Sequence, residues 1–262
     1  MTLKKIIKIS VSIVFYNSTE IDIKRVFQNI RQLNNISNFS FDFFLIDNAS
    51  TKKIKLDNLQ TSNVHVKYLQ RNDGFGAGHN SVLKDLDSDY HIIMNPDVSL
   101  NDTDGLIKAI NYMNSHSDVV LLSPLVRNEN DNQIQYLNRM EPTVFDLLIR
   151  FLGPNFFSKR QSKFVKKLGG YDHIQLEENA TGSFMLTKTI ELKKINGFDT
   201  RFFMYFEDTD LTKRMAEEGK VIFFPYFTIV HGWKRDNHTL KGLRPMILSM
   251  IKYFNKWGWK LY

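Results

Sequence analysis

The chain has 262 residues, 42% of them hydrophobic and 13% aromatic, which is enough to bury a sizeable core as one large domain or two small ones. It contains no cysteine, so disulfides, thiolate nucleophiles and cysteine-based zinc sites are excluded, and a reducing compartment is compatible with the composition. The formal net charge of +7 is concentrated in two patches, because segments 143–170 and 231–262 hold thirteen basic and only two acidic residues.

Up to about residue 125, short β-rich runs alternate with helical stretches, which is the pattern of an α/β protein built around a largely parallel sheet. Polar residues follow several of the strands, and open α/β sheets bind their ligands at the carboxyl ends of the strands. We therefore expect a binding site at that edge. The expected strands are residues 9–15, 41–46, 64–69, 90–94 and 119–123, and the expected helices are residues 21–34, 77–86 and 102–115.

Beyond residue 125 the regular alternation ends, and no internal repeat or linker marks a domain boundary. The helix that follows the "FFMYF" run is expected to stop at Gly219, since glycine commonly ends helices. The other expected elements are a hairpin strand within 130–140, basic helical material over 143–168, strands within 180–188, 221–224 and 227–230, and a C-terminal helix.

Two loops that follow strands contain candidate nucleotide contacts. Asp47 ends a buried-looking strand and could accept hydrogen bonds from a base or ribose, although Asp and Asn also simply start turns. The loop "RNDGFGAGHN" over 71–80 lies between a strand and a helix and resembles a phosphate-cradling loop. Its spacing matches neither G-x-G-x-x-G nor a Walker loop, and a tight turn that needs positive φ is the alternative.

A third loop, "NPDV", delivers Asp97 from the end of an apolar strand, with Pro96 fixing the local backbone. A hard cation such as Mg²⁺ or Mn²⁺ needs oxygen ligands of this kind, but Asn, Pro and Asp also form ordinary turns. His231 ends a later strand and could bind a metal or a phosphate, although a lone histidine is more often structural.

The stretch "FFMYFEDTDL" over 202–211 sets three carboxylates, Glu207, Asp208 and Asp210, directly behind a run of aromatic side chains. Anions in the first turn of a helix are favoured by the helix dipole, which is the simplest explanation. The functional alternative is that the apolar neighbours desolvate one carboxylate, raise its proton affinity and make it a general base.

The C-terminal helix has apolar residues at steps of three and four, with Lys252, Lys256 and Lys260 in a row beside them. This pattern predicts either a contact with an anionic membrane surface or an amphipathic helix packed on the protein. No nucleic-acid-binding motif accompanies the basic patches, so nucleic acid is not an expected partner. We expect neither a signal peptide nor a membrane-spanning helix.

The motifs "FYN", "IDNAS", "NDGFGAGHN", "NPDV", "TGSFML" and "GFDTRFFMYFEDTDLTKRM", followed by His231, occur in an order that resembles the inverting glycosyltransferases of family 2. Within that family, "NPD" in place of the usual DxD and the "FMYFEDTDL" block are similar to bacterial rhamnosyltransferases that use dTDP-L-rhamnose. The resemblance implies a GT-A fold with a Rossmann-like, mostly parallel sheet over residues 1–230. The acceptor-side elements would begin near residue 125, and residues 231–262 would form a basic amphipathic helical segment that associates with membranes.

The resemblance also implies roles for individual residues. Asp208 corresponds to the catalytic base with Glu207 beside it, which leaves Asp210 as a helix-terminal charge. Asp97 corresponds to the metal-binding acid and His231 to a residue that assists the metal or the diphosphate, whereas Asn95 departs from the family pattern by one carboxylate. The implied contacts to the base and ribose are Phe15, Tyr16, Asn17 and Asp47, and those to the rest of the nucleotide sugar are Arg71, Asn72, Gly74 and backbone through Gly78.

The implied activity is the transfer of L-rhamnose to a hydroxyl of a glycan acceptor, including one linked to polyprenyl diphosphate, in bacterial cell-surface polysaccharide synthesis. A divalent metal, Mg²⁺ or Mn²⁺, is the implied cofactor. The implied location is the cytoplasmic face of the cell membrane, where the enzyme would be peripheral. Two alternatives stay open: a family 2 transferase that uses a UDP-hexose or UDP-N-acetylhexosamine, and a non-catalytic sugar-nucleotide or glycan-binding module.

Overall fold

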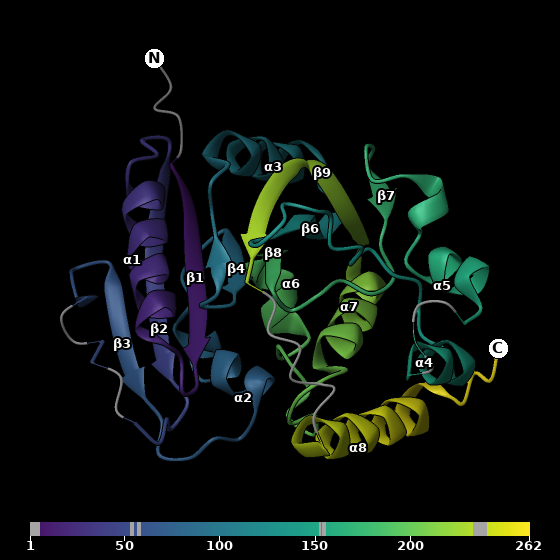
Figure 1. Cartoon of the computed structure of the whole chain (residues 1–262). Coiled ribbons are helices and arrows are strands. Elements are labelled where there is room, and N and C mark those ends of the chain that lie inside the picture. The colour runs from purple at the N-terminus through teal and green to yellow at the C-terminus, as the bar shows by residue number, and fades with distance from the viewer. Residues whose placement is uncertain (1–5, 53–54, 57–58, 152, 154–155, 233–239) are drawn as a thin grey trace.

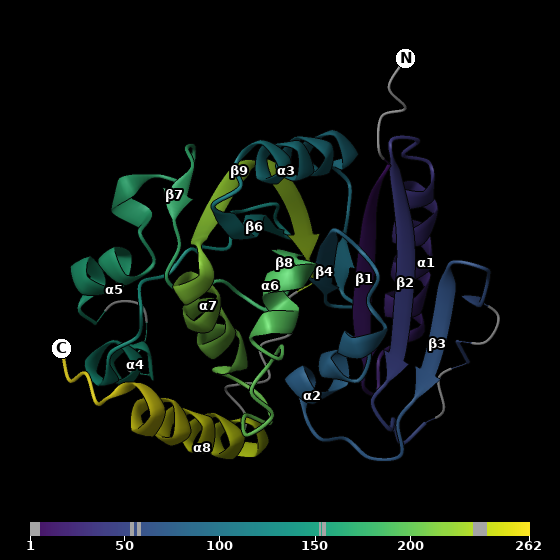
Figure 2. The same cartoon turned by 180° about the vertical axis from the view of Figure 1, so that it is seen from behind.

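A computed structural model describes residues 6–52, 55–56, 59–151, 153, 156–232 and 240–262. Among these residues, nine strands form one sheet in the order β3-β2-β1-β4-β8-β6-β9-β5, and β7 pairs with β9 off this path. Helices cover both faces of the sheet (Figures 1 and 2), as the α/β interpretation of the sequence predicts. Lys234 and Arg235 of the basic C-terminal segment lie outside the described residues.

The first half of the sheet follows the predicted strands closely. Its four strands are parallel to one another: β1 (Ile7–Phe15), β2 (Phe39–Asp47), β3 (Val64–Tyr68) and β4 (Tyr90–Met94). They are joined through α1 (Glu20–Asn34) and α2 (Phe75–Asn80). The single helix predicted over 77–86 is wrong, because α2 ends at Asn80 and a separate 3₁₀ turn covers Leu83–Asp85.

The second half of the sheet is mixed, which the sequence did not indicate. Strand β8 (Phe184–Lys188) runs antiparallel between β4 and β6 (Val119–Asn128). Strand β9 (Lys220–His231) is parallel to β6, and two short strands, β5 (Val98–Ser99) and β7 (Gln175–Leu176), pair antiparallel with β9. The mostly parallel arrangement thus holds for β3-β2-β1-β4 and for the β6–β9 pair.

Two strand predictions in the second half are wrong. The strands expected at 221–224 and 227–230 form one strand, β9, because a register shift against β6 absorbs the residues around Pro225 without breaking the pairing. The hairpin expected within 130–140 is absent from the described strands: this segment makes only single bridges, Arg127 with Ile134 and Arg139 with Asn179. It runs instead along the cleft described below.

Apolar side chains of the helices pack on the two faces of the sheet. On one face, α1 and α3 (Thr103–Ser115) contribute to a large cluster with the odd-numbered residues of β1. On the other face, α6 (Thr189–Lys194) and α7 (Glu207–Glu218) pack on β4, β6 and β8. Helix α7 ends at Gly219, as predicted. These two layers hold the carboxyl ends of β1 and β4 fixed beside the start of α7.

The basic middle segment forms two short helices, α4 (Val144–Phe151) and α5 (Ser158–Phe164). The C-terminal helix α8 (Leu240–Trp257) lies under α7 and next to α4 (Figure 1). Its Tyr253 and Phe254 are buried in a cluster with Phe202, so its apolar stripe packs on the protein. Among the described helices, none is long and apolar enough to cross a membrane.

Candidate active site

A cleft of about 760 Å³ opens at the carboxyl ends of β1 and β4 and extends to the start of α7. Its position at the carboxyl edge of the parallel strands agrees with the expectation from the sequence. The cleft brings together residues that are more than 200 positions apart in the chain. Nine of the predicted site residues line it: Tyr16, Asn17, Asn72, Gly74, Asn95, Asp97, Glu207, Asp208 and His231.

At one end of the cleft, the loop after β1 is held against the loop after β2. The Oδ1 atom of Asn17 accepts hydrogen bonds from the N–H and the hydroxyl of Thr51, at 2.9 and 2.8 Å. Tyr16 is half-exposed and presents its ring to the cleft. The side chains of Phe15 and Asp47 do not line the cleft: Phe15 is buried in the core, and Asp47 accepts from the N–H of Ser50. Both residues therefore support the loops after β1 and β2 from inside the protein.

Gly74 connects the glycine-rich loop to the segment before α7. Its φ is +106°, and a Cβ atom there would lie 2.2 Å from the backbone oxygen of Phe203, so only glycine fits. Asn72 Oδ1 accepts from the N–H of Gly74 at 2.9 Å, and the next residue, Phe75, donates its N–H to the Phe203 oxygen at 3.0 Å. The positive-φ turn that the sequence offered as an alternative is therefore present and also lines the cleft.

Two other residues predicted to line the nucleotide-sugar pocket do not do so. The guanidinium of Arg71 is 83% exposed and pairs with Asp73 at 2.7 Å outside the cleft. Gly78 lies against Val14, where a Cβ atom would meet the valine methyl groups at 2.9 Å. Arg71 is wrong as a cleft residue because its side chain points to solvent, and Gly78 serves close packing of α2 on β1.

Asp97 and His231 meet at the edge of the sheet, because β5 pairs antiparallel with the end of β9. The Oδ1 atom of Asp97 lies 3.3 Å from Nε2 of His231. Gln135 donates to the backbone oxygen of His231 at 3.1 Å, so its Oε1, 3.2 Å from Nδ1 of the same histidine, accepts the Nδ1 proton. The ring then points Nε2 toward the carboxylate of Asp97.

This juxtaposition fits a cation. A carboxylate oxygen and an imidazole lone pair repel each other unless a proton or a positive ion lies between them, and both are ligands of Mn²⁺-like metals. Burial by itself raises the pKa of Asp97, but the hydrogen bond and charge of His231, with Arg25 further away, lower it below the usual value. Within the described part of the chain, no group of three or more His, Asp or Glu side chains forms a complete metal cage. The two residues would therefore share a metal with oxygens of a ligand.

Glu207 and Asp208 are adjacent, but their environments differ. Tyr205 and Phe206 both have left-handed φ values, 67° and 64°, and this turn sends Glu207 into the protein. Its Oε2 atom is buried without a hydrogen-bond partner among the described atoms. Burial, reinforced by the charge of Asp208, raises the pKa of Glu207 well above its usual value.

Asp208 faces the cleft and stays partly accessible. Its Oδ2 atom accepts from the N–H of Gly182 at 3.1 Å, and its Oδ1 atom accepts from the N–H of Thr209 at 2.8 Å. These donors fix the carboxylate in place. The sequence predicted one desolvated carboxylate, intended as the base. The structure assigns the desolvation to Glu207 and leaves Asp208 as the more accessible carboxylate of the pair.

Asp210 lies in the first turn of α7, as the predicted helix-terminal charge, but its side chain has no exposed surface. Its two oxygens bind Arg214 at 2.8 Å and Lys256 at 2.6 Å. Lys252 donates to the backbone oxygen of Arg201, and Lys260 pairs with Glu141. The three lysines of the predicted basic row therefore all make contacts within the protein.

Several cleft residues were not identified from the sequence. Arg139 and Arg150 line the cleft on the side of α4, where Arg150 lies over the ring of Phe164 at 5.5 Å. Asp22 lies at the opposite side and pairs with Arg25 at 3.2 Å. No local motif marks these residues. Whether each of these charged side chains reaches the cleft depends on how its segment packs against the sheet, which only the tertiary fold decides.

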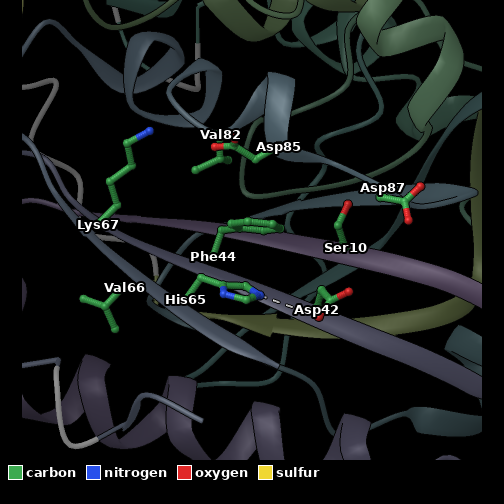
Figure 3. A pocket seen from close by; sticks show the side chains of 9 residues that line it. All are labelled: Ser10, Asp42, Phe44, His65, Val66, Lys67, Val82, Asp85 and Asp87. Atoms are coloured by element: carbon green, nitrogen blue, oxygen red, sulfur yellow. Dashed lines mark ion pairs between the residues drawn. The ribbon is translucent and has the colours of Figure 1, made fainter. Parts of the chain in front are cut away.

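A second, smaller cavity of about 390 Å³ lies away from this cleft, on the open face of β2 and β3 (Figure 3). Its polar side chains are largely exposed: His65 lies 3.7 Å from Asp42 within the cavity, and Asp87 pairs with Lys8, outside the lining, at 2.8 Å. None of the predicted site residues lines it. The larger cleft is therefore the candidate active site.

Comparison with known proteins agrees with this assignment. The sequence profile of "Glycosyl transferase family 2" matches residues 10–178, which is more than half of the chain. Rhamnosyltransferase WbbL of Escherichia coli K12 is 29% identical over 192 residues, which cover 68% of this chain and 70% of that protein.

Solved structures share the fold. GalNAc-T7 with UDP, GalNAc and Mn²⁺ and the mannosyltransferase PcManGT from Pyrobaculum calidifontis with GDP-Man and Mn²⁺ both superpose with a TM-score of 0.65 at 15% identity. They match 96% and 94% of this chain, which spans 48% and 64% of theirs. TarS of S. aureus with UDP-GlcNAc superposes with a TM-score of 0.58 at 17% identity, over 95% of this chain and 67% of that one. The fold is therefore the GT-A type of glycosyltransferases that the sequence implied.

Proposed function

The chain belongs to glycosyl transferase family 2, and on that premise we propose that it is an inverting glycosyltransferase whose donor is dTDP-L-rhamnose. The observation that carries the proposal is the shared cleft, which has the Asp97–His231 pair on one wall and the accessible carboxylate of Asp208 on another. One wall can hold a diphosphate leaving group while the other accepts a proton from the incoming hydroxyl. A non-catalytic binding module has no need of the second wall.

In the proposed reaction, the acceptor hydroxyl gives its proton to Asp208 as its oxygen forms a bond to the anomeric carbon. The bond from that carbon to the diphosphate oxygen breaks on the opposite face, and the nucleoside diphosphate leaves with the electron pair. The configuration at the anomeric carbon is inverted. The N–H groups of Gly182 and Thr209 hold Asp208 in position for this step.

Glu207 beside Asp208 has a different role in this proposal. A second charge at that position would repel Asp208 and raise its proton affinity before the acceptor arrived. Because burial raises the pKa of Glu207, the base stands next to a carboxyl that favours its uncharged form. We assign Glu207 to shaping the acceptor side of the cleft, and proton transfer to Asp208 alone.

Asp97 and His231 would hold a divalent metal at the diphosphate end of the cleft. When bound, such an ion supplies positive charge that offsets the charge developing on the leaving group. Asn95, whose buried Oδ1 atom has no partner among the described atoms, lines the same wall. Asn17, Tyr16 and Asn72 would contact the nucleoside, with Phe15, Asp47 and Gly78 supporting their loops from below.

The donor assignment rests on the likeness to the rhamnosyltransferase from E. coli. Two of the structurally similar proteins hold UDP or UDP-GlcNAc, so a UDP-sugar is the alternative donor. The test is a transfer assay with dTDP-L-rhamnose, UDP-galactose and UDP-N-acetylglucosamine, combined with thermal shifts on dTDP and UDP. We expect dTDP-L-rhamnose to be turned over fastest. Faster turnover of a UDP-sugar would reject dTDP-L-rhamnose as the donor but would still agree with a glycosyltransferase.

We also propose that the protein works at the cytoplasmic membrane surface on a lipid-linked glycan acceptor. The support is an exposed apolar strip on α8, formed by Ile247, Leu248 and Ile251, next to the half-exposed Phe203 and Met204 at the rim of the cleft. Apolar side chains on an interfacial helix insert into the boundary between headgroups and acyl chains. Contact through this strip would bring the acceptor side of the cleft close to the bilayer.

A further inference from the structure

Two arginines on the proposed acceptor side of the cleft have no carboxylate in direct contact among the described residues. Arg139 comes from the segment that crosses β6 and β9, and Arg150 comes from α4; both line the cleft. Among the described residues, neither forms an ion pair. By contrast, Arg25, Arg160 and Arg214 each hold a carboxylate within 3.2 Å.

Burying two guanidinium groups without an anionic partner costs free energy. Burial lowers the pKa of Arg150 to about 10, and repulsion from the nearby Arg139 contributes to the shift. Burial also lowers the pKa of Arg139, against the opposing charges of Asp208 and Glu177. The Nε atom of Arg139 is buried and has no hydrogen-bond partner among the described atoms. The two guanidinium groups are therefore neighbouring buried cations, and the Nε donor of Arg139 is available to an anion.

The position of the pair favours an anion on the acceptor over the diphosphate of the donor. Arg139 interacts electrostatically with Asp208, the proposed base that receives the acceptor proton. The charge of Asp97, at the donor end, is instead balanced by His231 and Arg25. An anion bound to Arg139 would thus lie near Asp208, the residue proposed to receive the proton of the attacking hydroxyl.

Apolar side chains surround the two guanidinium groups. Phe164 holds Arg150 through a cation–π contact, and Leu147, Pro142 and Met246 continue the same wall of the cleft. A free inorganic ion would gain no binding energy from contact with these apolar side chains. A phosphate joined to a hydrocarbon chain fits both features, because the guanidinium forks bind the phosphate oxygens and the wall covers the first carbons of the chain.

We propose that Arg139 and Arg150 form a phosphate subsite for the acceptor, which recognises the phosphate or diphosphate that links the acceptor glycan to its lipid. The inference rests on the proposed function and adds to it the anionic class of the acceptor and the two residues that select it. The subsite orders the acceptor so that its sugar hydroxyl reaches Asp208.

The test measures binding of farnesyl diphosphate and of farnesol by calorimetry to protein saturated with dTDP. We expect Arg139→Gln and Arg150→Gln each to weaken farnesyl diphosphate binding by about tenfold to a hundredfold, which is the usual cost of a lost charge-assisted contact. Farnesol binding should not change. Arg31→Gln, on the exposed surface of α1, is the matched control and should leave both affinities unaltered.

Three results would overturn the subsite. Unchanged farnesyl diphosphate affinity in folded Arg139→Gln and Arg150→Gln proteins would remove the phosphate contact. Weaker binding of dTDP itself in these variants would assign the arginines to the donor. Loss of binding to phosphatidylglycerol vesicles, with farnesyl diphosphate affinity retained, would assign them to bilayer headgroups. Arg139→Lys, which keeps the charge, serves as a second variant should Arg139→Gln fail to fold.

Failure of the proposed function gives a different pattern. If the protein binds no dTDP and no UDP at all, the glycosyltransferase proposal falls, whatever the farnesyl diphosphate result. If nucleotide binding is normal and the two arginine variants bind farnesyl diphosphate as tightly as the parent protein, only the phosphate subsite falls.

Discussion

Asp210 in the first turn of α7 is bonded to Lys256 in the last turn of α8, with Oδ1 and Nζ 2.6 Å apart. The same oxygen accepts from the indole N–H of Trp257 at 2.9 Å. Because Asp210 lies only two residues after Asp208, this contact ties the C-terminal helix directly to the helix that carries the proposed base. Helix α8 is therefore part of the support of the active site.

Asp210→Asn is predicted to destabilise the protein strongly. The change removes the buried carboxylate that binds both Arg214 and Lys256, and Arg214 has no other ion-pair partner among the described residues, so the expected cost is about 3–5 kcal/mol. Lys256 keeps its second carboxylate, Asp199, at 2.8 Å. Thermal unfolding followed by circular dichroism measures the loss. Asp118→Asn, which breaks an exposed pair with Lys220, is the control and should shift the midpoint far less; equal shifts for both variants would contradict the prediction.

Asp208→Asn is predicted to lower kcat by roughly 10²–10⁴-fold with little change in dTDP affinity, because it removes the proton acceptor and leaves the donor wall intact. Glu207→Gln is the matched comparison: burial favours the uncharged form of this carboxyl, so the neutral amide should retain most of the activity. Steady-state kinetics and nucleotide binding give both quantities. Near-normal turnover by Asp208→Asn would remove this residue from the base role.

Asp97→Ala is predicted to abolish the effect of metal on nucleotide binding. In the parent protein, Mn²⁺ should strengthen dTDP binding, since Asp97 and His231 would share the ion with the diphosphate. Calorimetric titrations of dTDP with Mn²⁺ and with a chelator measure this difference. The same dTDP affinity in the parent protein under both conditions would count against a metal at Asp97 and His231.

Glu177→Gln is predicted to stabilise the protein at alkaline pH. Burial raises the pKa of Glu177 to about 7, although the hydrogen bond from Ser123 opposes the shift. A carboxyl with a raised folded-state pKa favours folding fully below its unfolded pKa near 4.5, and this contribution is lost as pH rises through 7. The variant should therefore gain on the order of 3 kcal/mol relative to the parent at pH 8, and little at pH 4.5. Chemical denaturation at both pH values measures the change in the free energy of unfolding. An equal change at pH 8 and pH 4.5 would contradict a raised pKa of Glu177.

The membrane contact is predicted to depend on the apolar strip of α8 more than on its lysines. Leu248→Ser combined with Ile251→Ser should weaken binding to phosphatidylglycerol vesicles without lowering the unfolding midpoint, because both side chains are substantially exposed. Ile21→Ser, at an exposed position of α1, is the control. Vesicle sedimentation reads out the binding. Unchanged sedimentation of the double variant would leave α8 with a packing role only.

Local patterns in the sequence determined the strands of the first half, the helices α1, α3 and α7, and the general fold class. These features depend on the periodicity of neighbouring residues and on turn chemistry, which are visible without the rest of the chain. The order of the motifs also pointed to Asp97 and Asp208, because both follow recognisable apolar runs at the edge of the sheet. The same edge of the sheet also explains why four other predicted residues line the cleft, because they lie in loops that follow its strands: Tyr16, Asn17, Asn72 and Gly74.

Only the tertiary structure decided which charged residues are buried and what each one contacts. Asp210 became an internal ion-pair partner, Glu207 the desolvated carboxyl, and Arg139 and Arg150 unpaired cations of the cleft, because segments distant in sequence pack around them. The insertion of β8 antiparallel between β4 and β6 likewise depends on pairing across nearly a hundred residues. Burial and electrostatic environment are properties of such long-range contacts, and a local sequence pattern does not contain them.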